Sequence, residues 1–214
     1  MQTVQSKIRC VIYDCDGVLF DSFEANTKLY NDLCAWVGRG PLNEEEMQYV
    51  HVRTVLEAIQ FIFGKDSDLE KKALETLRER QVDLRNYVEY LKMEPHLVQT
   101  LEKLKEKGVL RAINTNRTTS MKHVMERYGL GPYFEMVVTA LDVKNPKPHP
   151  ESIEKIIEAF QLKKEEAVFI GDSEVDKQTA ESSGVRFIAY KNKEIANDLF
   201  IEDHLDLLNL ILSH

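Results

Sequence analysis

The chain has 214 residues, of which 43% are hydrophobic and 30% charged, a composition typical of a globular protein that can bury a sizeable core. Its formal charge of −8 argues against nucleic acid or an anionic membrane as the main partner. Three cysteines without CxxC spacing favour reduced thiols over a disulfide framework or a zinc site. Since the first residues resemble neither a signal peptide nor a membrane anchor, we expect a cytoplasmic protein.

The stretch from Ile8 to Ser22 is the most informative part of the chain. An apolar, β-branched run ends in Asp14 and Asp16, and Gly17 follows, which predicts a buried strand that delivers two carboxylates to the edge of a sheet. Two carboxylates this close are costly unless a cation or a proton neutralises one of them. An ordinary Asp-Gly turn and a metal site with a reacting phosphate both explain the pattern.

A long helical stretch follows this strand. Its pattern predicts one helix from Asp21 or Ser22 to about Gly38, a second from an Asn43–Glu46 capping box to Gly64, and a third from Ser67 to about Leu91. Some seventy helical residues are too many for a simple crossover between parallel strands. We therefore predict a helical cap domain, residues 21–92, inserted into a core domain of residues 1–20 and 93–214.

From Pro95 onward the pattern alternates between helix and strand. Helices are predicted at 96–107, 118–128 and 151–160, before Gly184 and at the C-terminus; strands are predicted at 109–113, 134–138, 167–170 and 185–190. This alternation predicts an α/β fold, a Rossmann-like, mostly parallel sheet with helices on both faces. Ligands of such sheets bind beyond the carboxyl ends of the strands.

Polar side chains gather at the predicted strand ends. They are Asp14, Asp16, Thr115, Asn116, Lys147, Asp172 and Asp176. Taken singly, Thr115 could be a helix N-cap, Lys147 a solvated loop residue, and the last two acids partners of a helix dipole. Their common position at one sheet edge favours a phosphoryl-transfer site. There the acids hold Mg2+, the lysine and hydroxyl bind phosphate oxygens, and one carboxylate attacks phosphorus.

Four ordered stretches carry a resemblance to a known family. They are Asp14-Cys-Asp-Gly-Val-Leu-Phe-Asp-Ser, Asn-Thr115-Asn-Arg, Lys147-Pro-His-Pro and Gly-Asp172-Ser-Glu-Val-Asp. Together they resemble the motifs of the haloacid dehalogenase-like hydrolases, in the branch of phosphoglycolate phosphatase and β-phosphoglucomutase. The resemblance spans the whole chain and implies an inserted helical cap between the first and second motifs.

The resemblance also implies catalytic roles. Asp14 would be the nucleophile that becomes an aspartyl phosphate. Asp16 would protonate the leaving oxygen and then activate water. Thr115 and the amide of Asn116 would bind phosphate, and Lys147 would hold both the nucleophile and the phosphate. The dehalogenating members lack an acid at the position of Asp16, so its presence favours phosphate-ester hydrolysis.

The metal and substrate residues follow from the same resemblance. A carboxylate oxygen of Asp14, the backbone carbonyl of Asp16 and the carboxylate of Asp172 would hold Mg2+. Asp176 would orient the lysine or a metal-bound water. In the cap, Arg53 is the candidate for binding a second anionic group of the substrate, although an ordinary surface arginine explains it equally well.

We therefore expect a Mg2+-dependent phosphatase that acts on a small phosphorylated metabolite, as a monomer or homodimer, without nucleic-acid or membrane partners. Two alternatives remain open. One is a phosphomutase of the β-phosphoglucomutase type, which passes the phosphoryl group to a sugar hydroxyl. The other is a non-enzymatic phosphoaspartate signalling module, although such receivers are shorter and lack an Asp two residues after the nucleophile.

Overall fold

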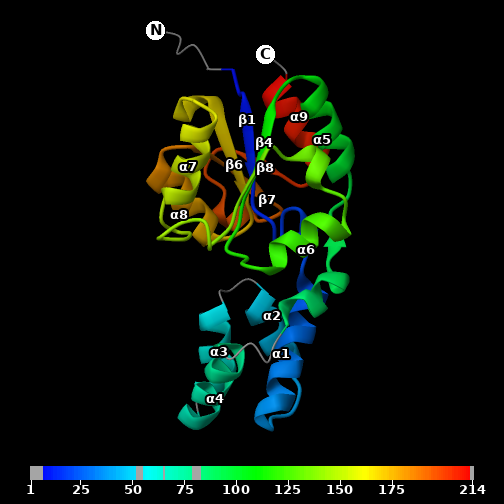
Figure 1. The fold of residues 1–214 in the computed structure, drawn as a ribbon, viewed down its shortest axis with the longest axis vertical. Helices are drawn as coiled ribbons and strands as arrows, with labels where there is room; N and C mark the ends of the chain where they lie inside the picture. Colours follow the sequence, from blue (N-terminus) through cyan, green and yellow to red (C-terminus); the bar gives the residue numbers. More distant parts are fainter. Residues whose placement is uncertain (1–6, 52–54, 65, 79–82, 213–214) are drawn as a thin grey trace. The chain divides into compact units, whose positions relative to one another are not determined.

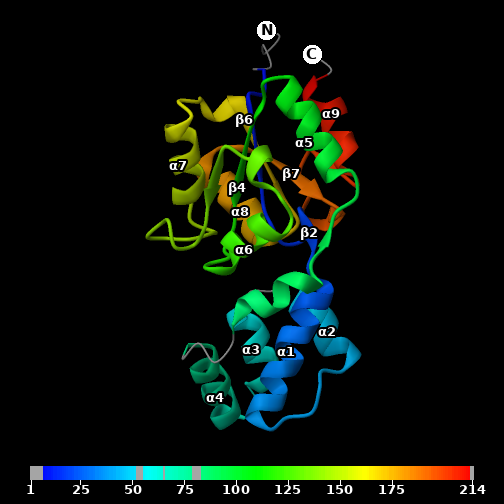
Figure 2. The ribbon, with the colours of Figure 1, turned by 45° about the vertical axis from the view of Figure 1, so that its right-hand side comes forward.

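The computed structural model describes residues 7–51, 55–64, 66–78 and 83–212. These residues form two compact units (Figures 1 and 2). The first joins the chain up to Asp21 to the chain from Met93 onward, and the second comprises Ser22–Lys92. Within the described residues, no helix is both long and apolar enough to cross a membrane.

The first unit is built on a parallel sheet. Its strands within the described residues are β1 (Cys10–Tyr13), β4 (Leu110–Asn114), β5 (Met136–Val138), β6 (Ala167–Gly171), β7 (Arg186–Tyr190) and β8 (Phe200–Ile201). They lie in the order β5-β4-β1-β6-β7-β8, and every neighbouring pair is parallel. The predicted α/β fold is thus confirmed. The two-residue strand β8 was not predicted, because such a short segment carries no periodicity.

Helices cover both faces of this sheet (Figure 1). They are α5 (Leu97–Glu106), α6 (Ser120–Arg127), α7 (Glu151–Ala159), α8 (Glu174–Ser183) and α9 (His204–Leu212). Ile153 and Ile156 of α7 and Ala180 of α8 pack with Ile12 and Phe169 in a buried cluster on one face. Helices α5 and α9 contact each other, and their buried apolar residues are Leu97, Leu101, Leu104, Leu207 and Ile211. Short 3-10 turns lie at Gly131–Tyr133, Lys164–Glu166 and Lys193–Ile195.

The second unit is a helical insertion between β1 and β4. Its α-helices within the described residues are α1 (Phe23–Val37), α2 (Glu44–His51), α3 (Val55–Phe63) and α4 (Ser67–Arg78). Helix α1 ends at Gly38, which has a left-handed φ of 86°. The predicted capping box is present: the amide of Asn43 donates to Glu46, and the amide of Glu46 donates to Asn43, both at 2.9 Å.

Two elements of the insertion differ from the prediction. Within the described residues, the expected single helix from Asn43–Glu46 to Gly64 is two helices, α2 and α3. The expected single helix from Ser67 to about Leu91 is α4 followed by a separate 3-10 helix, η1 (Leu84–Tyr90). Asp83 starts η1 by accepting the amide of Arg85 at 3.0 Å. An aspartate that bonds the amide two residues ahead begins a new turn instead of extending the preceding helix.

Two short strands lie where the chain leaves and rejoins the first unit. They are β2 (Phe20–Asp21) and β3 (Lys92–Met93), and they pair with each other. They bracket the whole insertion. Both ends of the inserted segment therefore meet at one paired point of the chain.

Candidate active site

The site residues follow three neighbouring strands whose ends are in register. Tyr13, the last residue of β1, pairs with Ile113 of β4 and with Ile170 of β6. Asp14 and Thr115 follow the ends of β1 and β4, and Asp172 follows that of β6. Because the chain crosses from β1 to strands on both of its sides, this edge is the switch point where parallel sheets bind ligands.

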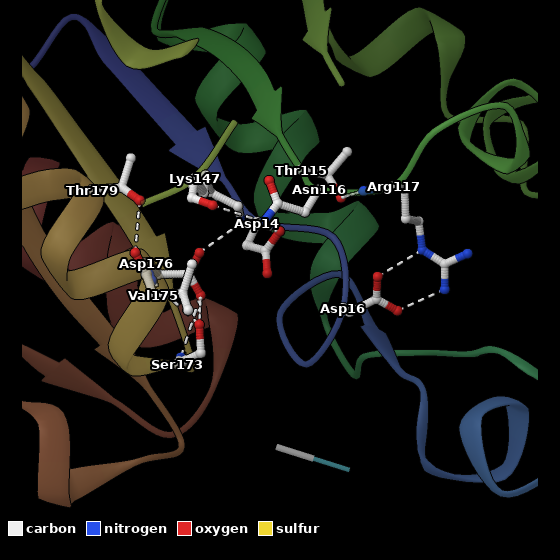
Figure 3. A network of polar contacts seen from close by, with 10 residues as sticks. All are labelled: Asp14, Asp16, Thr115, Asn116, Arg117, Lys147, Ser173, Val175, Asp176 and Thr179. Carbon is white, nitrogen blue, oxygen red and sulfur yellow. Dashed lines mark hydrogen bonds and ion pairs between the residues drawn. The ribbon is translucent and has the colours of Figure 1, made fainter. Parts of the chain in front are cut away.

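Lys147 forms the centre of a buried ionic group (Figure 3). Its Nζ lies 2.8 Å from Oδ1 of Asp14 and 2.6 Å from Oδ1 of Asp176. The side chains of Lys147 and Asp176 are 4% and 0% exposed, so both charges have lost nearly all contact with water. Such charges are tolerated in a folded protein only when they are paired. The lysine is therefore held in a fixed position beside Asp14.

Three carboxylates form a compact acidic cluster in this part of the chain. Oxygens of Asp14, Asp172 and Asp176 all lie within 4.8 Å of one another. Burial, and next the negative charge of Asp176, raise the pKa values of both Asp14 and Asp172, while Lys147 opposes the rise. A cation bound here would relieve this repulsion, and carboxylate oxygens are ligands that hard divalent cations prefer. The cluster is therefore able to hold a metal ion.

The start of helix α8 fixes Asp176. The hydroxyl of Ser173 accepts the Asp176 amide at 3.3 Å and the Ser173 amide donates to Oδ2 of Asp176 at 3.3 Å, which together form a capping box. The Ser173 hydroxyl also donates to the same Oδ2 at 2.5 Å. Gly171 leaves the space that this arrangement needs, because a Cβ atom there would lie 2.2 Å from Cβ of Asp176. One carboxylate oxygen thus caps the helix while the other pairs with Lys147.

Gly17 likewise leaves space for the carboxylate of Asp172. It has a left-handed φ of 74°, and a Cβ atom at this position would lie 1.9 Å from Oδ2 of Asp172. A Gly17→Ala variant should therefore displace the Asp172 carboxylate and strain the turn. We expect at least tenfold weaker binding of a divalent metal ion, about 1.4 kcal/mol, when titrated calorimetrically. A Gly129→Ala variant is the matched control, because Gly129 also has a positive φ but no atom within 4 Å of an added Cβ. Equal metal affinities in both variants would contradict this prediction.

Thr115 and Asn116 lie beside the ionic group. The Thr115 hydroxyl accepts the amide of Arg117 at 3.0 Å, which leaves its own hydrogen for donation to an anion. The Asn116 side chain donates to the backbone carbonyl of Lys147 at 3.1 Å and so joins the loop after β4 to the lysine loop. Thr115 does not cap a helix, because α6 begins only at Ser120.

Asp16 stands apart from the acidic cluster. Its two carboxylate oxygens accept from Nε and Nη2 of Arg117 at 2.7 and 2.6 Å, a bidentate ion pair that Figure 3 shows to one side of Asp14. Arg117 was not predicted as a site residue. Its position two residues after Thr115, in the same stretch, is the signal that could have identified it.

Asn192 was missed as well. It lies after β7, outside the four motifs, and its side chain donates to the backbone carbonyl of Asp172 at 2.9 Å. A lone asparagine after a strand resembles any turn residue, so no sequence signal marks it. Arg53, the predicted contact for a second anionic group, lies outside the described residues.

Comparison with known proteins identifies the family. The model of the haloacid dehalogenase-like hydrolases matches residues 11–190. The chain belongs to this family. A crystal structure of a haloacid dehalogenase-superfamily hydrolase, subfamily IA, variant 1, from Geobacter sulfurreducens is 40% identical in sequence. The two superimpose with a TM-score of 0.81 over 97% of this hydrolase and 100% of that chain, which supports the sheet and its helical insertion.

Curated relatives of this hydrolase are phosphatases. A phosphoglycolate phosphatase of Rhodobacter capsulatus is 27% identical over 191 residues, covering 84% of this chain and 83% of its own. The pyrophosphatase PpaX of Oceanobacillus iheyensis is 24% identical over 222 residues, covering 95% of this chain and 97% of its own. Both relatives span the core and the insertion.

Proposed function

We propose that this hydrolase is a Mg2+-dependent phosphatase that cleaves a small phosphorylated metabolite through an aspartyl-phosphate intermediate on Asp14. The observation that carries the proposal is the position of Asp14, at the end of the central strand β1 and 2.8 Å from the buried ammonium of Lys147. A fixed cation beside a carboxylate both orients the nucleophile and offsets the charge of an incoming phosphoryl group.

The proposed reaction has two steps. In the first, a carboxylate oxygen of Asp14 attacks phosphorus, the ester bond breaks, and Asp16 gives a proton to the leaving oxygen. In the second, Asp16 takes a proton from water as the water attacks the aspartyl phosphate, which releases phosphate and restores Asp14. For the first transfer Asp16 leaves its ion pair with Arg117 and turns toward the leaving oxygen as the protonated carboxyl group, and for the second the resulting carboxylate takes the proton of the attacking water. Lys147, Thr115 and the amide of Asn116 bind the non-bridging phosphate oxygens.

The acidic cluster fits a divalent cation in this scheme. Asp14 and Asp172 would hold Mg2+ together with the Asp16 carbonyl, and Asp176 would keep Lys147 in place. When bound, Mg2+ supplies positive charge that offsets the repulsion between the carboxylates and the phosphate. The raised pKa values of Asp14 and Asp172 support this assignment, because they mark a site that disfavours unneutralised negative charge.

Metal removal should abolish the activity and lower the stability. We expect EDTA-treated protein to release no phosphate from p-nitrophenyl phosphate and to recover on addition of Mg2+. At a free concentration one hundred times its Kd, Mg2+ should stabilise the fold by about 2.7 kcal/mol, measured as a rise in thermal midpoint. The same Mg2+ addition to an Asp172→Asn variant is the control and should give a smaller rise. Full activity after EDTA treatment would contradict the metal assignment.

The substrate of this hydrolase can be identified by screening. The activities for which the relatives are named make 2-phosphoglycolate and pyrophosphate the first candidates, and both carry a second anionic group. A panel of phosphorylated metabolites, with release of inorganic phosphate as the readout, tests the proposal. Magnesium-dependent release from at least one panel member is the expected result. A stable phosphoprotein without turnover, or isomerisation of a sugar phosphate that needs a bisphosphate activator, would overturn it.

A further inference from the structure

The turn that carries Asp16 is closed by its own backbone. The amide of Gly17 donates to the carbonyl of Phe20 at 2.8 Å, and the amides of Leu19 and Phe20 donate to the carbonyl of Cys15 at 3.0 and 3.1 Å. These bonds make residues 15–20 one compact unit. The position of Asp16 therefore depends on how this turn as a whole is held.

Two residues distant in the sequence bind the turn. The Nε2 atom of His204, at the start of α9, lies 2.8 Å from the carbonyl oxygen of Val18. The amide of Glu94, directly after β3, donates to the carbonyl of Leu19 at 3.0 Å. His204 is fully buried, and Glu94 is 7% exposed. Two consecutive carbonyls of the turn are thus bound from the C-terminal helix and from the segment that returns from the insertion.

A polar network joins these two anchors. The Glu94 carboxylate accepts the Tyr190 hydroxyl at 2.9 Å and the Lys191 ammonium at 2.5 Å. The Tyr190 ring stacks on the imidazole of His204, with 4.7 Å between the ring centroids. Tyr190 therefore contacts both the group that binds Leu19 and the one that binds Val18. None of these side chains belongs to the four motifs.

The chemistry of His204 determines its role in this bond. A carbonyl oxygen can only accept, so Nε2 carries the hydrogen. Burial lowers the pKa of His204, which favours the neutral ring. Its Nδ1 is buried without a hydrogen-bond partner among the described residues, so a second proton there would find no acceptor. The imidazole is thus a fixed, neutral donor to the turn.

We propose that His204 is a positioning residue for the hydrolysis: its bond to the Val18 carbonyl holds the turn in the place from which Asp16 reaches the leaving oxygen. This inference rests on the proposed function and extends it to residues outside the motifs. Glu94 and Tyr190 support the same turn from its other carbonyl. His204 itself contacts no reacting atom.

Loss of the hydrogen bond between His204 and the Val18 carbonyl should change how strongly kcat/KM depends on the leaving group of the ester. Nitrophenolate is a weak base and departs with little help, whereas phenolate needs the proton that Asp16 supplies. The measured quantity is kcat/KM for phenyl phosphate divided by kcat/KM for p-nitrophenyl phosphate, because kcat/KM includes the step in which the ester bond breaks. A general loss of folded protein changes both values equally and leaves the ratio unchanged.

His204→Phe keeps the ring against Tyr190 and removes the donor. We expect it to lower the ratio by about tenfold, part of the roughly 10²–10⁴ that a placed general acid contributes. His204→Gln restores a donor and should recover most of the ratio, while Asp16→Asn should show the largest fall. Ile211→Val, a buried change on the same helix, is the matched control and should leave the ratio unchanged.

An unchanged ratio in folded His204→Phe would overturn the inference. If that variant does not fold, Tyr190→Phe, which removes only the hydroxyl bonded to Glu94, takes its place and should lower the ratio about twofold, part of the same general-acid contribution. An unchanged ratio there would equally overturn it. Absence of hydrolysis of either ester by the unaltered protein would instead refute the proposed function, so the two failures are distinguishable.

Discussion

An Asp14→Asn variant should lose hydrolysis of p-nitrophenyl phosphate by on the order of 10⁴-fold or more, because an amide cannot serve as the attacking carboxylate. The fold should survive the change. Asparagine has nearly the same shape, and burial already disfavours the charged form of Asp14, as its raised pKa indicates. The measurement is phosphate release in the presence of Mg2+, together with the thermal midpoint of the metal-free variant.

The control for this variant is Asp198→Asn, the same chemical change at an exposed aspartate. It should retain full activity. If the metal-free Asp14→Asn protein has a thermal unfolding midpoint equal to or above that of the unaltered protein, its loss of activity is not due to unfolding. Normal turnover in a folded Asp14→Asn variant would refute Asp14 as the nucleophile.

A Lys147→Met variant should lose both activity and stability. Methionine fills a similar volume but leaves the buried carboxylates of Asp14 and Asp176 without their cation. Breaking a buried ion pair by removing one partner costs about 3–5 kcal/mol. Urea unfolding of the metal-free protein measures this loss, and phosphate release measures the accompanying loss of catalysis. Lys144→Met, at an exposed lysine of the same loop, is the control and should change neither.

The stability loss in Lys147→Met should also depend on pH. Burial and Asp176 raise the pKa of Asp14, and removing the opposing lysine raises it further. A carboxyl group with a raised folded pKa stabilises the fold at low pH, and this contribution is lost as the pH rises through that pKa. The deficit should therefore be small at about pH 5 and large at about pH 8. A deficit that shrinks with rising pH would contradict the assignment of the lysine as the partner of these acids.

Much of the fold could be predicted from local patterns. The buried run before Asp14 and the later alternation of helix and strand predict parallel strands, because only such strands need helical crossovers between them. The capping box at Asn43 could also be predicted from the sequence, because it depends only on two residues three positions apart. The separation of α4 from η1 could not be predicted from the sequence, because the turn at Asp83 depends on a single hydrogen bond from the Arg85 amide to the Asp83 side chain.

The candidate site was predictable where it depends on strand ends and not where it depends on side-chain direction. Asp14, Thr115 and Asp172 follow strands in register, so their proximity follows from the parallel sheet. The pairing of Asp16 with Arg117 depends on the geometry of a turn. The anchoring of Val18 by His204 joins residues 186 positions apart, which no local pattern encodes.

The paired strands β2 and β3 bring the two ends of the insertion together at one point. Closing such a loop costs little extra entropy as its length grows, since each doubling adds about 0.6 kcal/mol. Helices of different number or length can therefore be exchanged between these strands without altering the order of the sheet. The insertion can then change without altering the residues at the strand ends, and exchanging it with a relative's would test whether the insertion determines substrate specificity.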